Sequence, residues 1–394
     1  MQFLSAGESH GKGLSIMLED VPAGLHIDVD FINHQLWRRQ QGYGRGGRMQ
    51  IETDTVEIMS GVRFGVTTGA PVALWIKNRD YANWENIMDP LAQPSDISEK
   101  KSFHRPRPGH ADLAGHYKYG LDDLRDVLER SSARETASRV AAGAIAQLLL
   151  QQVCGVEFLS HVIELGSIKP NPNDIPTGFT ELKQTVESND LRCAGSEALL
   201  AEMRAKIDAA QEAGVTLGGR IEVIGVNIPA GLGSYVQWNR RLDGQLAQAV
   251  MSIQAVKSVS IGYADLAPVV TGNLFHDGIH LNTDNNTIER TSNNAGGLEG
   301  GVTNGQPLIV QAIMKPISTM RTPIESVNLK TMSSEKAHFE RSDVTAVAAC
   351  GVIAEAMVAL TVANALQHKY GSDSVSDIKQ HLKASSANKL QLSS

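Results

Sequence analysis

Apolar positions along the chain form short runs in some regions and long segments in others, and this difference distinguishes predicted strands from predicted helices. Short apolar runs rich in β-branched residues predict strands at residues 51–59, 72–76, 219–228 and 307–314. Longer alanine-rich segments predict helices at residues 121–152, 242–256 and 344–368, the first with a candidate break near Ser131. Each half of the chain is therefore predicted to be strand-rich first and helical afterwards.

The long predicted helices are apolar on most faces, which is typical of helices that are covered on several sides. They favour an α+β fold with a helical layer inside flanking sheets. The stretch from Val344 to Leu366 is also long enough to cross a membrane. Because Glu355 and Asn364 would be costly inside a bilayer, we predict a buried core helix and no membrane partner.

Three segments recur in the same order later in the chain, which indicates an internal repeat. The matching pairs are 21–25 with 228–232, 65–72 with 301–308, and 129–131 with 340–342. The repeat predicts one domain, residues 1–394, made of two related halves at about 1–170 and 215–394. A turn-rich polar stretch that begins at Lys169 separates the halves.

Composition excludes several classes of protein. With 394 residues, 42% of them hydrophobic, the chain is too apolar to be disordered and too varied to be fibrous. Because 43 acidic residues outnumber 36 basic ones, nucleic acid is not an expected partner. Three cysteines without metal-ligand spacing predict buried thiols and no metal site. With a start that lacks a signal peptide, they also predict a cytoplasmic location.

Two loops combine a histidine with residues that shape the backbone. His10 is flanked by glycines in the segment 7–13, and His110 follows Arg107 in the proline-containing segment 104–112. Glycine lets the backbone approach a ligand, and proline stiffens a loop. A histidine changes charge near neutral pH, so both are candidate acids or bases. A surface turn or a plain exposed loop would carry the same residues.

Arginines gather in a region that has no acidic residue, between His34 and Gln50. The four arginines of this segment are Arg38, Arg39, Arg45 and Arg48. Planar guanidinium groups bind phosphate and carboxylate with two hydrogen bonds, so the segment is a candidate anion site. A solvated basic loop would look the same. An RNA-binding Arg-Gly box is a weaker alternative, because the motif occurs once and without interleaved aromatic residues.

Two predicted helix starts and one glycine-rich stretch complete the candidates. Ser132 and Glu135 form a capping box, which predicts a helix N-terminus and an anion site beside Arg134. The matching position of the second half is Asp343, which a simple N-cap would explain. Five glycines in residues 296–305 form neither a Walker loop nor a dinucleotide fingerprint. A flexible hairpin would also explain them.

Taken together, these segments resemble the chorismate synthase family over nearly the whole chain. The segments that carry the resemblance are 7–11, 107–112, 130–136, 300–305 and 341–343. The resemblance implies the family fold, an α+β fold with a helical core layer sandwiched between two antiparallel sheets and an internal pseudo-duplication. It also implies a homotetramer.

The resemblance further implies an enzyme, a carbon-oxygen lyase. The family converts 5-enolpyruvylshikimate 3-phosphate into chorismate and phosphate, the last common step of aromatic biosynthesis. This 1,4-anti elimination needs reduced FMN but gives no net redox change. By resemblance, His10 protonates the leaving phosphate, His110 protonates the reduced flavin, and Asp343 acts with flavin N5 as the base.

The substrate carries a phosphate and two carboxylates, and the resemblance assigns five arginines to it. These are Arg39, Arg45, Arg48, Arg107 and Arg134. The implied FMN contacts are Ser131, Ser132, Ala133, Gln254, Ala255, Gly300, Lys315, Pro316, Ile317, Ser318, Thr319 and Arg341. Since the chain contains no recognisable reductase module, we predict dependence on an external reductase. An NADPH contact near Arg39 and Arg45 is left open, and NADPH would take part only if the chain reduced FMN itself.

Two other functions are compatible with the motifs. A flavoprotein oxidoreductase would also use FMN but would oxidise one flavin for each product. A single-stranded nucleic-acid binder would use the arginine-rich loops, and its binding would depend steeply on salt.

Overall fold

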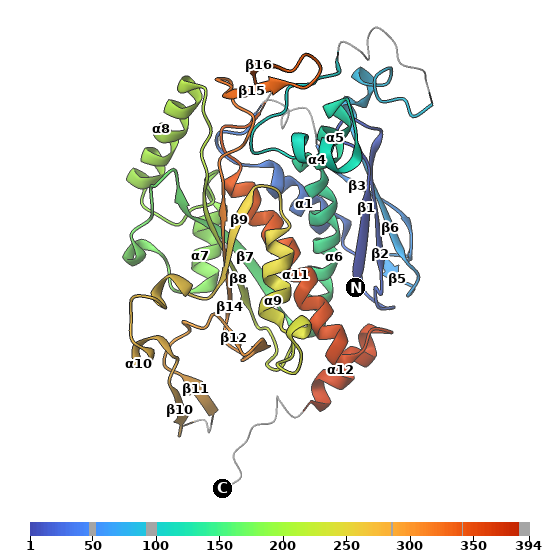
Figure 1. Ribbon diagram of the computed structural model, residues 1–394. Coiled ribbons are helices and arrows are strands. Elements are labelled where there is room, and N and C mark those ends of the chain that lie inside the picture. The colour runs from blue at the N-terminus through green and yellow to red at the C-terminus, as the bar shows by residue number, and fades with distance from the viewer. Residues whose placement is uncertain (47–52, 92–100, 285–286, 341, 386–394) are drawn as a thin grey trace.

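Two antiparallel four-stranded sheets lie on either side of a layer of helices (Figure 1). This arrangement comes from a computed structural model that describes residues 1–46, 53–91, 101–284, 287–340 and 342–385. It confirms the expected α+β class with a helical core layer. One large apolar core contains residues of both sheets and of the helices between them.

The two sheets have the same topology. The first contains β1 (Gln2–Ala6), β2 (Gly13–Glu19), β6 (Val72–Lys77) and β3 (Val56–Ser60), in that order. The second contains β7 (Glu157–Leu165), β8 (Gly219–Val226), β14 (Leu308–Met314) and β9 (Val256–Ile261). In each sheet the strands follow the order first, second, fourth and third along the chain, and all neighbours are antiparallel. The fold therefore contains a pseudo-duplication.

The helical layer repeats in the same way. In the first half α1 (Val29–Gln40) follows the second strand and α6 (Thr136–Cys154) follows the fourth. In the second half α9 (Leu242–Met251) and α11 (Val347–Tyr370) hold these positions. The two long helices, α6 and α11, cross at the centre of the molecule. Gly143 of α6 permits a close approach, because a Cβ there would lie 2.3 Å from the Cβ of Ala356.

The remaining elements surround this layered core. The helices and 3-10 turns are η1 (Arg79–Asn83), α4 (Asp112–Tyr119), α5 (Leu124–Ser131), η2 (Ala133–Glu135), η3 (Pro172–Asp174), α7 (Phe179–Glu187), α8 (Glu197–Ala213), η4 (Trp238–Arg240), η5 (Ala264–Leu266), α10 (Gly272–Phe275) and α12 (Val375–Ala384). The short hairpins are β4 with β5 (Val62–Arg63, Val66–Thr67), β10 with β11 (Ile279–Asn282, Thr287–Arg290), β12 with β13 (Leu298–Glu299, Val302–Thr303) and β15 with β16 (Glu325–Asn328, Ser333–Lys336). The helices α4 and α5 and the hairpin β15–β16 gather at one end of the core (Figure 1).

Several predicted boundaries differ from the observed ones. The predicted helix 242–256 ends at Met251, Ala255 adopts a left-handed conformation with φ 68°, and the edge strand β9 begins at Val256. The helix predicted from Val344 begins three residues later, at Val347. Strand β3 starts at Val56, and residues 51 and 52 of its predicted range lie outside the described residues. The predicted break near Ser131 is confirmed, because α5 ends there.

The membrane-length segment is a core helix. Of the most apolar window of α11, 94% is buried inside the protein. Glu355 in its middle is paired with Arg38, whose Nη1 and Nη2 lie 2.7 and 2.9 Å from the two carboxylate oxygens. Arg38 therefore belongs to the core and not to the candidate anion site. Charge at the centre of the helix is satisfied within the fold.

Candidate functional site

His10 lies in the loop between β1 and β2, and the carboxylate of Glu129 holds its side chain. Its Nδ1 lies 2.8 Å from Oε1 of Glu129, and its backbone N–H donates to Oε2 at 2.8 Å. The imidazole stacks on Trp84 with a centroid distance of 3.9 Å. Because Glu129 belongs to α5, this contact fixes the orientation of the ring against the helix.

His110 lies just before α4, and a second carboxylate, that of Asp112, holds its side chain. Its Nδ1 lies 2.6 Å from Oδ1 of the fully buried Asp112. Arg107 donates to the same carboxylate from Nε at 2.8 Å and from Nη2 at 2.9 Å. Burial would raise the pKa of Asp112, but hydrogen bonds from Arg107 and His110 outweigh it and hold that pKa well below its ordinary value. Asp112 is therefore an anion that can support an imidazolium.

A third buried carboxylate, Asp54, joins two of the predicted substrate arginines. Arg134 Nη1 lies 2.6 and 2.7 Å from its two oxygens, and Arg39 Nη2 lies 2.8 Å from Oδ2. Asn78 accepts from Arg134 Nε at 2.9 Å. Burial, together with Arg134 and Arg45, lowers the pKa of Arg39 to about 10, although the charge of Asp54 opposes this shift. The single negative charge of Asp54 thus offsets only part of the positive charge of Arg39, Arg45 and Arg134.

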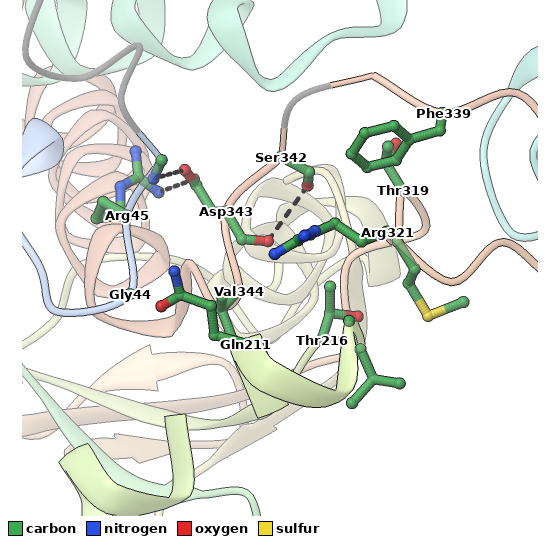
Figure 2. A pocket seen from close by; sticks show the side chains of 14 residues that line it. Gly44, Arg45, Gln211, Thr216, Thr319, Arg321, Phe339, Ser342, Asp343 and Val344 are labelled. Carbon is green, nitrogen blue, oxygen red and sulfur yellow. Dashed lines mark hydrogen bonds and ion pairs between the residues drawn. The ribbon is translucent and has the colours of Figure 1, made fainter. Parts of the chain in front are cut away.

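Asp343 lies in a pocket of about 110 Å³ (Figure 2). Its carboxylate accepts from the backbone N–H of Gly46 at 2.6 Å and pairs with Arg45 Nη1 at 2.7 Å. It caps no helix, because α11 starts at Val347 with Ala346 in the capping position. The simple N-cap considered from the sequence is therefore wrong. Arg48, predicted beside Arg45, lies outside the described residues.

Thr319 connects this pocket to the His110 loop. It lines the pocket with Asp343, and its Oγ1 accepts from Arg107 Nη1 at 3.1 Å. Lys315 donates from Nζ to the carbonyl of Gly109, in the same loop. The structure therefore brings together residues that are far apart in sequence, the loops around His110 and Asp343 and the segment 315–319.

Similarity to known proteins covers nearly the entire chain. The sequence model of the family described as chorismate synthase matches residues 1–367. A chorismate synthase of Carboxydothermus hydrogenoformans is 48% identical over 381 residues, which make up 96% of this chain and 97% of that protein. One of Aquifex aeolicus is 46% identical over 390 residues, or 96% of each protein. The chain belongs to the chorismate synthase family.

A solved structure supports the same assignment. A crystal structure described as that of a chorismate synthase matches with a TM-score of 0.76 and 38% identity, and covers 99% of this chain and 98% of its own. The fold expected from the family resemblance is thus shown by sequence and by structure.

Several of the residues expected to contact FMN in this family lie around the start of α6. Ser132 donates to Oγ of Ser9, next to His10, at 3.2 Å. Gln254 donates to Oε2 of Glu135 at 3.1 Å. The carbonyl of Ala255 accepts from the backbone N–H of Lys315 at 2.9 Å. The segments that carry these residues, 131–135, 254–255 and 315, are therefore neighbours.

The predicted capping box is half correct. Ser132 Oγ accepts from the backbone N–H of Arg134 at 3.3 Å, as a cap should. Glu135 does not return the contact, because its carboxylate binds Arg139 at 2.9 Å and Gln254. The Ser132 N–H donates instead to the carbonyl of Leu128. The cap begins the short turn η2, and α6 follows it.

Three polar atoms in this region suit a polar ligand. Ser131 Oγ, Gln254 Oε1 and Arg134 Nη2 are buried and have no hydrogen-bond partner among the described residues. Unsatisfied buried polar atoms are costly, so they indicate groups that a ligand would contact. These residues fit a cofactor with hydroxyl, phosphate and ring-amide groups.

Gly300 lies apart from the other expected cofactor residues. It occupies the turn of the hairpin β12–β13, where Gly301 accepts from the backbone N–H of Leu242 at the start of α9. Gln254 follows the far end of that helix. At about 1.5 Å per residue, the ten residues of α9 separate the two by about 15 Å. Arg341, the remaining expected contact, lies outside the described residues.

The carboxylates that hold His10, His110, Arg39 and Arg134 were not identified from the sequence. Asp112 and Glu129 stand inside the quoted motifs, so their proximity to a histidine and an arginine was the available signal. Asp54, Asn78 and Trp84 lie in no motif, and their roles depend on contacts made only in the folded chain. Within the described part of the chain, no group of three or more His, Cys, Asp or Glu side chains is placed to hold a metal.

Proposed function

We propose that this family member is the lyase that converts 5-enolpyruvylshikimate 3-phosphate into chorismate and phosphate, with reduced FMN and without net redox change. The supporting observation is the pairing of charges around one site. Four predicted substrate arginines are largely buried, and each contacts a carboxylate, while two histidines contact carboxylates of their own. Such a site can bind a substrate with three anionic groups and supply protons.

The arginines would bind the anionic groups of the substrate. Arg134 keeps Nη1 on Asp54 while its buried Nη2 has no partner among the described residues, so this nitrogen can donate to a phosphate or carboxylate. Arg39 shares the same carboxylate. Because their aspartate anchor is buried, these guanidinium groups are already oriented before the substrate arrives.

His10 would protonate the leaving phosphate, and His110 would supply a proton to the reduced flavin. In each case a carboxylate accepts from Nδ1, which favours the tautomer that carries the reactive proton or lone pair on Nε2. The carboxylate also stabilises the imidazolium form. These contacts suit general acids that work near neutral pH.

Asp343 would take part in removing the substrate proton. Its carboxylate is oriented by Arg45 and by the Gly46 backbone, and it faces the pocket that Thr319 also lines. Residues 131–133, 254–255 and 315–319 would hold FMN beside this pocket. When bound in the reduced form, FMN supplies an electron-rich ring that assists loss of phosphate.

A homotetramer and a cytoplasmic location are also part of the proposal. Gly300 is separated from the other expected FMN contacts by the length of α9, which is compatible with a cofactor that touches two copies of the chain. We further propose that reduced FMN comes from an external reductase. An NADPH contact near Arg39 and Arg45 is the alternative.

Anaerobic turnover with photoreduced FMN tests the proposal. Phosphate release from 5-enolpyruvylshikimate 3-phosphate should continue for many turnovers per FMN, with the flavin still reduced at the end. If one flavin were oxidised for each product, the protein would be an oxidoreductase and the lyase proposal would be wrong. Salt-dependent binding to single-stranded oligonucleotides, without binding of the substrate, would favour the nucleic-acid alternative.

A further inference from the structure

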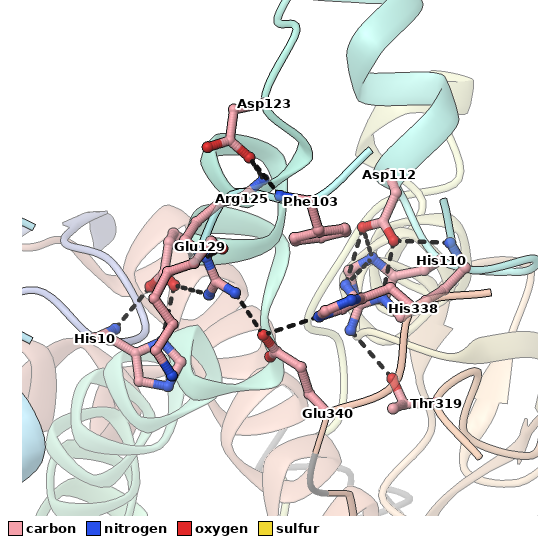
Figure 3. Close-up of polar contacts among 12 residues, drawn as sticks. His10, Phe103, His110, Asp112, Asp123, Arg125, Glu129, Thr319, His338 and Glu340 are labelled. Carbon is pink, nitrogen blue, oxygen red and sulfur yellow. Dashed lines mark hydrogen bonds and ion pairs between the residues drawn. The ribbon is translucent and has the colours of Figure 1, made fainter. Parts of the chain in front are cut away.

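Arg125 lies at the centre of an ionic network that the proposed roles leave unexplained (Figure 3). Its Nη1 donates to Glu129 at 3.2 Å and its Nη2 donates to Glu340 at 2.6 Å. Its Nε donates to the carbonyl of Lys101 at 2.6 Å. With only 5% of its surface exposed, Arg125 is fixed by three acceptors, one on its own helix α5 and two from distant segments.

Each of the two carboxylates that bind Arg125 also contacts a histidine. Glu129 holds His10, as described above, and Glu340 lies 3.4 Å from Nε2 of His338. The network therefore runs from His10 through Glu129, Arg125 and Glu340 to His338. Its two ends belong to distant segments of the sequence, because His10 precedes β2 and His338 follows β16.

Aromatic rings also connect Arg125 with the two histidines of the network. The Arg125 guanidinium lies over Trp84 at 5.2 Å and over Phe103 at 5.5 Å. Trp84 stacks on His10, and Phe103 stacks on His338 with centroids 4.2 Å apart. Each imidazole is therefore tied to Arg125 by a carboxylate and by a ring.

The part of the network around His338 also contacts the loop that carries Arg107 and His110. The backbone N–H of His338 donates to the carbonyl of Arg105 at 3.3 Å, and Arg107 lies over Phe103 at 5.8 Å. Ser326 of the hairpin β15–β16 donates to the carbonyl of Pro106 at 2.6 Å. A displacement of Glu340 or His338 would therefore be transmitted to this loop.

Carboxylates outnumber guanidinium groups in the network. Two carboxylates meet one guanidinium, so Arg125, Glu129 and Glu340 together carry one excess negative charge. Burial would raise the pKa of Glu340, but hydrogen bonds from His338 and Arg125 outweigh it and lower that pKa to about 2. Glu340 thus stays ionised at neutral pH and remains a charged partner for Arg125.

We propose that Arg125 and Glu340 are positioning residues that hold His10 and the Arg107–His110 loop in register, with His338 as the second imidazole of the network. This inference rests on the proposed function, because the two histidines that the network positions are the proposed proton donors of that reaction. A misplacement of about 1 Å at a reacting group can lower a rate by about 100-fold, so rigid support of both loops has a direct effect on turnover.

The test compares Glu340→Gln with Glu325→Gln, a matched control that loses only the exposed ion pair with Lys336. We expect Glu340→Gln to lower kcat by about 10- to 100-fold, with FMN affinity changed by less than about twofold and KM changed less than kcat, because Arg107 keeps its contacts with Asp112. Glu325→Gln should behave as wild type. Wild-type kcat in folded Glu340→Gln would overturn the inference.

A double-mutant cycle with His10→Ala tests whether Glu340 acts through His10. In the His10→Ala background, Glu340→Gln should lower kcat by a smaller factor than it does in the wild type, because the part of the loss that acts through His10 is gone. Fully additive losses would contradict the coupling to His10. If Glu340→Gln does not fold, His338→Gln replaces it, and wild-type kcat in that variant would equally reject the network.

A readout that needs no turnover separates this inference from the proposed function. In histidine-labelled protein, Glu340→Gln should move the NMR signals of His10 as well as those of His338, whereas Glu325→Gln should move neither. Unchanged His10 signals would reject the network even in an active enzyme. Absence of turnover in the wild type would reject the proposed function while the NMR result still decided the network.

Discussion

Arg134 and Asp54 form a two-point contact, in which one guanidinium nitrogen lies 2.6 and 2.7 Å from the two carboxylate oxygens. Both side chains are buried, and Arg39 binds the same aspartate. Burial of Asp54 would raise its pKa, but the charges and hydrogen bonds of both arginines hold it below the ordinary value. A single carboxylate thus organises two residues of the proposed anion site.

Asp54→Asn should therefore damage both stability and substrate binding. Removing one partner of a buried ion pair costs about 3–5 kcal/mol, and two arginines lose their anchor here. We expect the free energy of unfolding in urea to fall by an amount in this range and KM for the phosphorylated substrate to rise at least about tenfold. Asp190→Asn, in which an exposed carboxylate loses its contact with Arg204, should cost about 1 kcal/mol or less. Equal losses in the two variants would contradict the role given to Asp54.

The two histidines should be needed for turnover and not for folding. His10→Ala and His110→Ala are each expected to lower kcat by about 100- to 10,000-fold, the range typical of a lost general acid. Circular dichroism and FMN binding should stay close to wild type. His280→Ala, at a half-exposed histidine, serves as the control and should leave kcat unchanged. Wild-type kcat in either test variant would exclude that histidine as the acid.

Asp343→Asn distinguishes a functional carboxylate from a structural one. Because Asp343 caps no helix and its side chain faces a pocket, we expect kcat to fall at least about 100-fold. The free energy of unfolding should change by about 1 kcal/mol or less, since the Arg45 contact is partly exposed. A large loss of stability together with normal kcat would assign Asp343 a purely structural role.

The parts of the fold that were predictable share a local cause. Residues 136–154 and 347–370 bury nearly every face, so their predominantly apolar composition identifies them as core helices. Ala255 was assigned to a helix because its left-handed conformation leaves no trace in composition. The order of strands within each sheet was likewise not predicted, because it depends on pairing between distant segments.

The candidate site shows the same division. His10, His110 and the arginines stand in motifs whose glycines and prolines mark them locally. Asp54 has no such mark, because its partner Arg134 lies in another element and they meet only after folding. The arginine-rich segment looked free of acids along the chain, yet Asp343 and Asp54 reach Arg45 and Arg39 from elsewhere. Charge compensation at a distance cannot be deduced from neighbouring residues.

The depressed pKa of Glu340 predicts a pH dependence of stability. A carboxyl whose pKa falls from 4.5 to about 2 on folding stabilises the folded state above about pH 4.5, and this stabilisation is lost as the pH falls to about 2. Between pH 6 and pH 3 the free energy of unfolding should therefore fall more steeply in the wild type than in Glu340→Gln. Other buried carboxylates, such as Asp112, are common to both proteins and cancel in the comparison. Parallel curves from urea unfolding would show that Glu340 is not stabilised by the network.

The crossing of the two halves can be tested at Gly143. A Cβ at this position would meet backbone atoms of Ala356 on α11 at 2.5 and 2.7 Å, so the helices would have to separate. Overpacking of this kind costs about 1–3 kcal/mol, more than the gain in helix propensity from alanine. Gly143→Ala should therefore lower the midpoint of urea unfolding. Gly244→Ala is the matched control, because it also lies in a helix but its Cβ would come no closer than 4.0 Å to another atom, and it should raise stability by about 0.4–1 kcal/mol. If Gly143→Ala were as stable as Gly244→Ala, close contact between α6 and α11 would not hold the halves together.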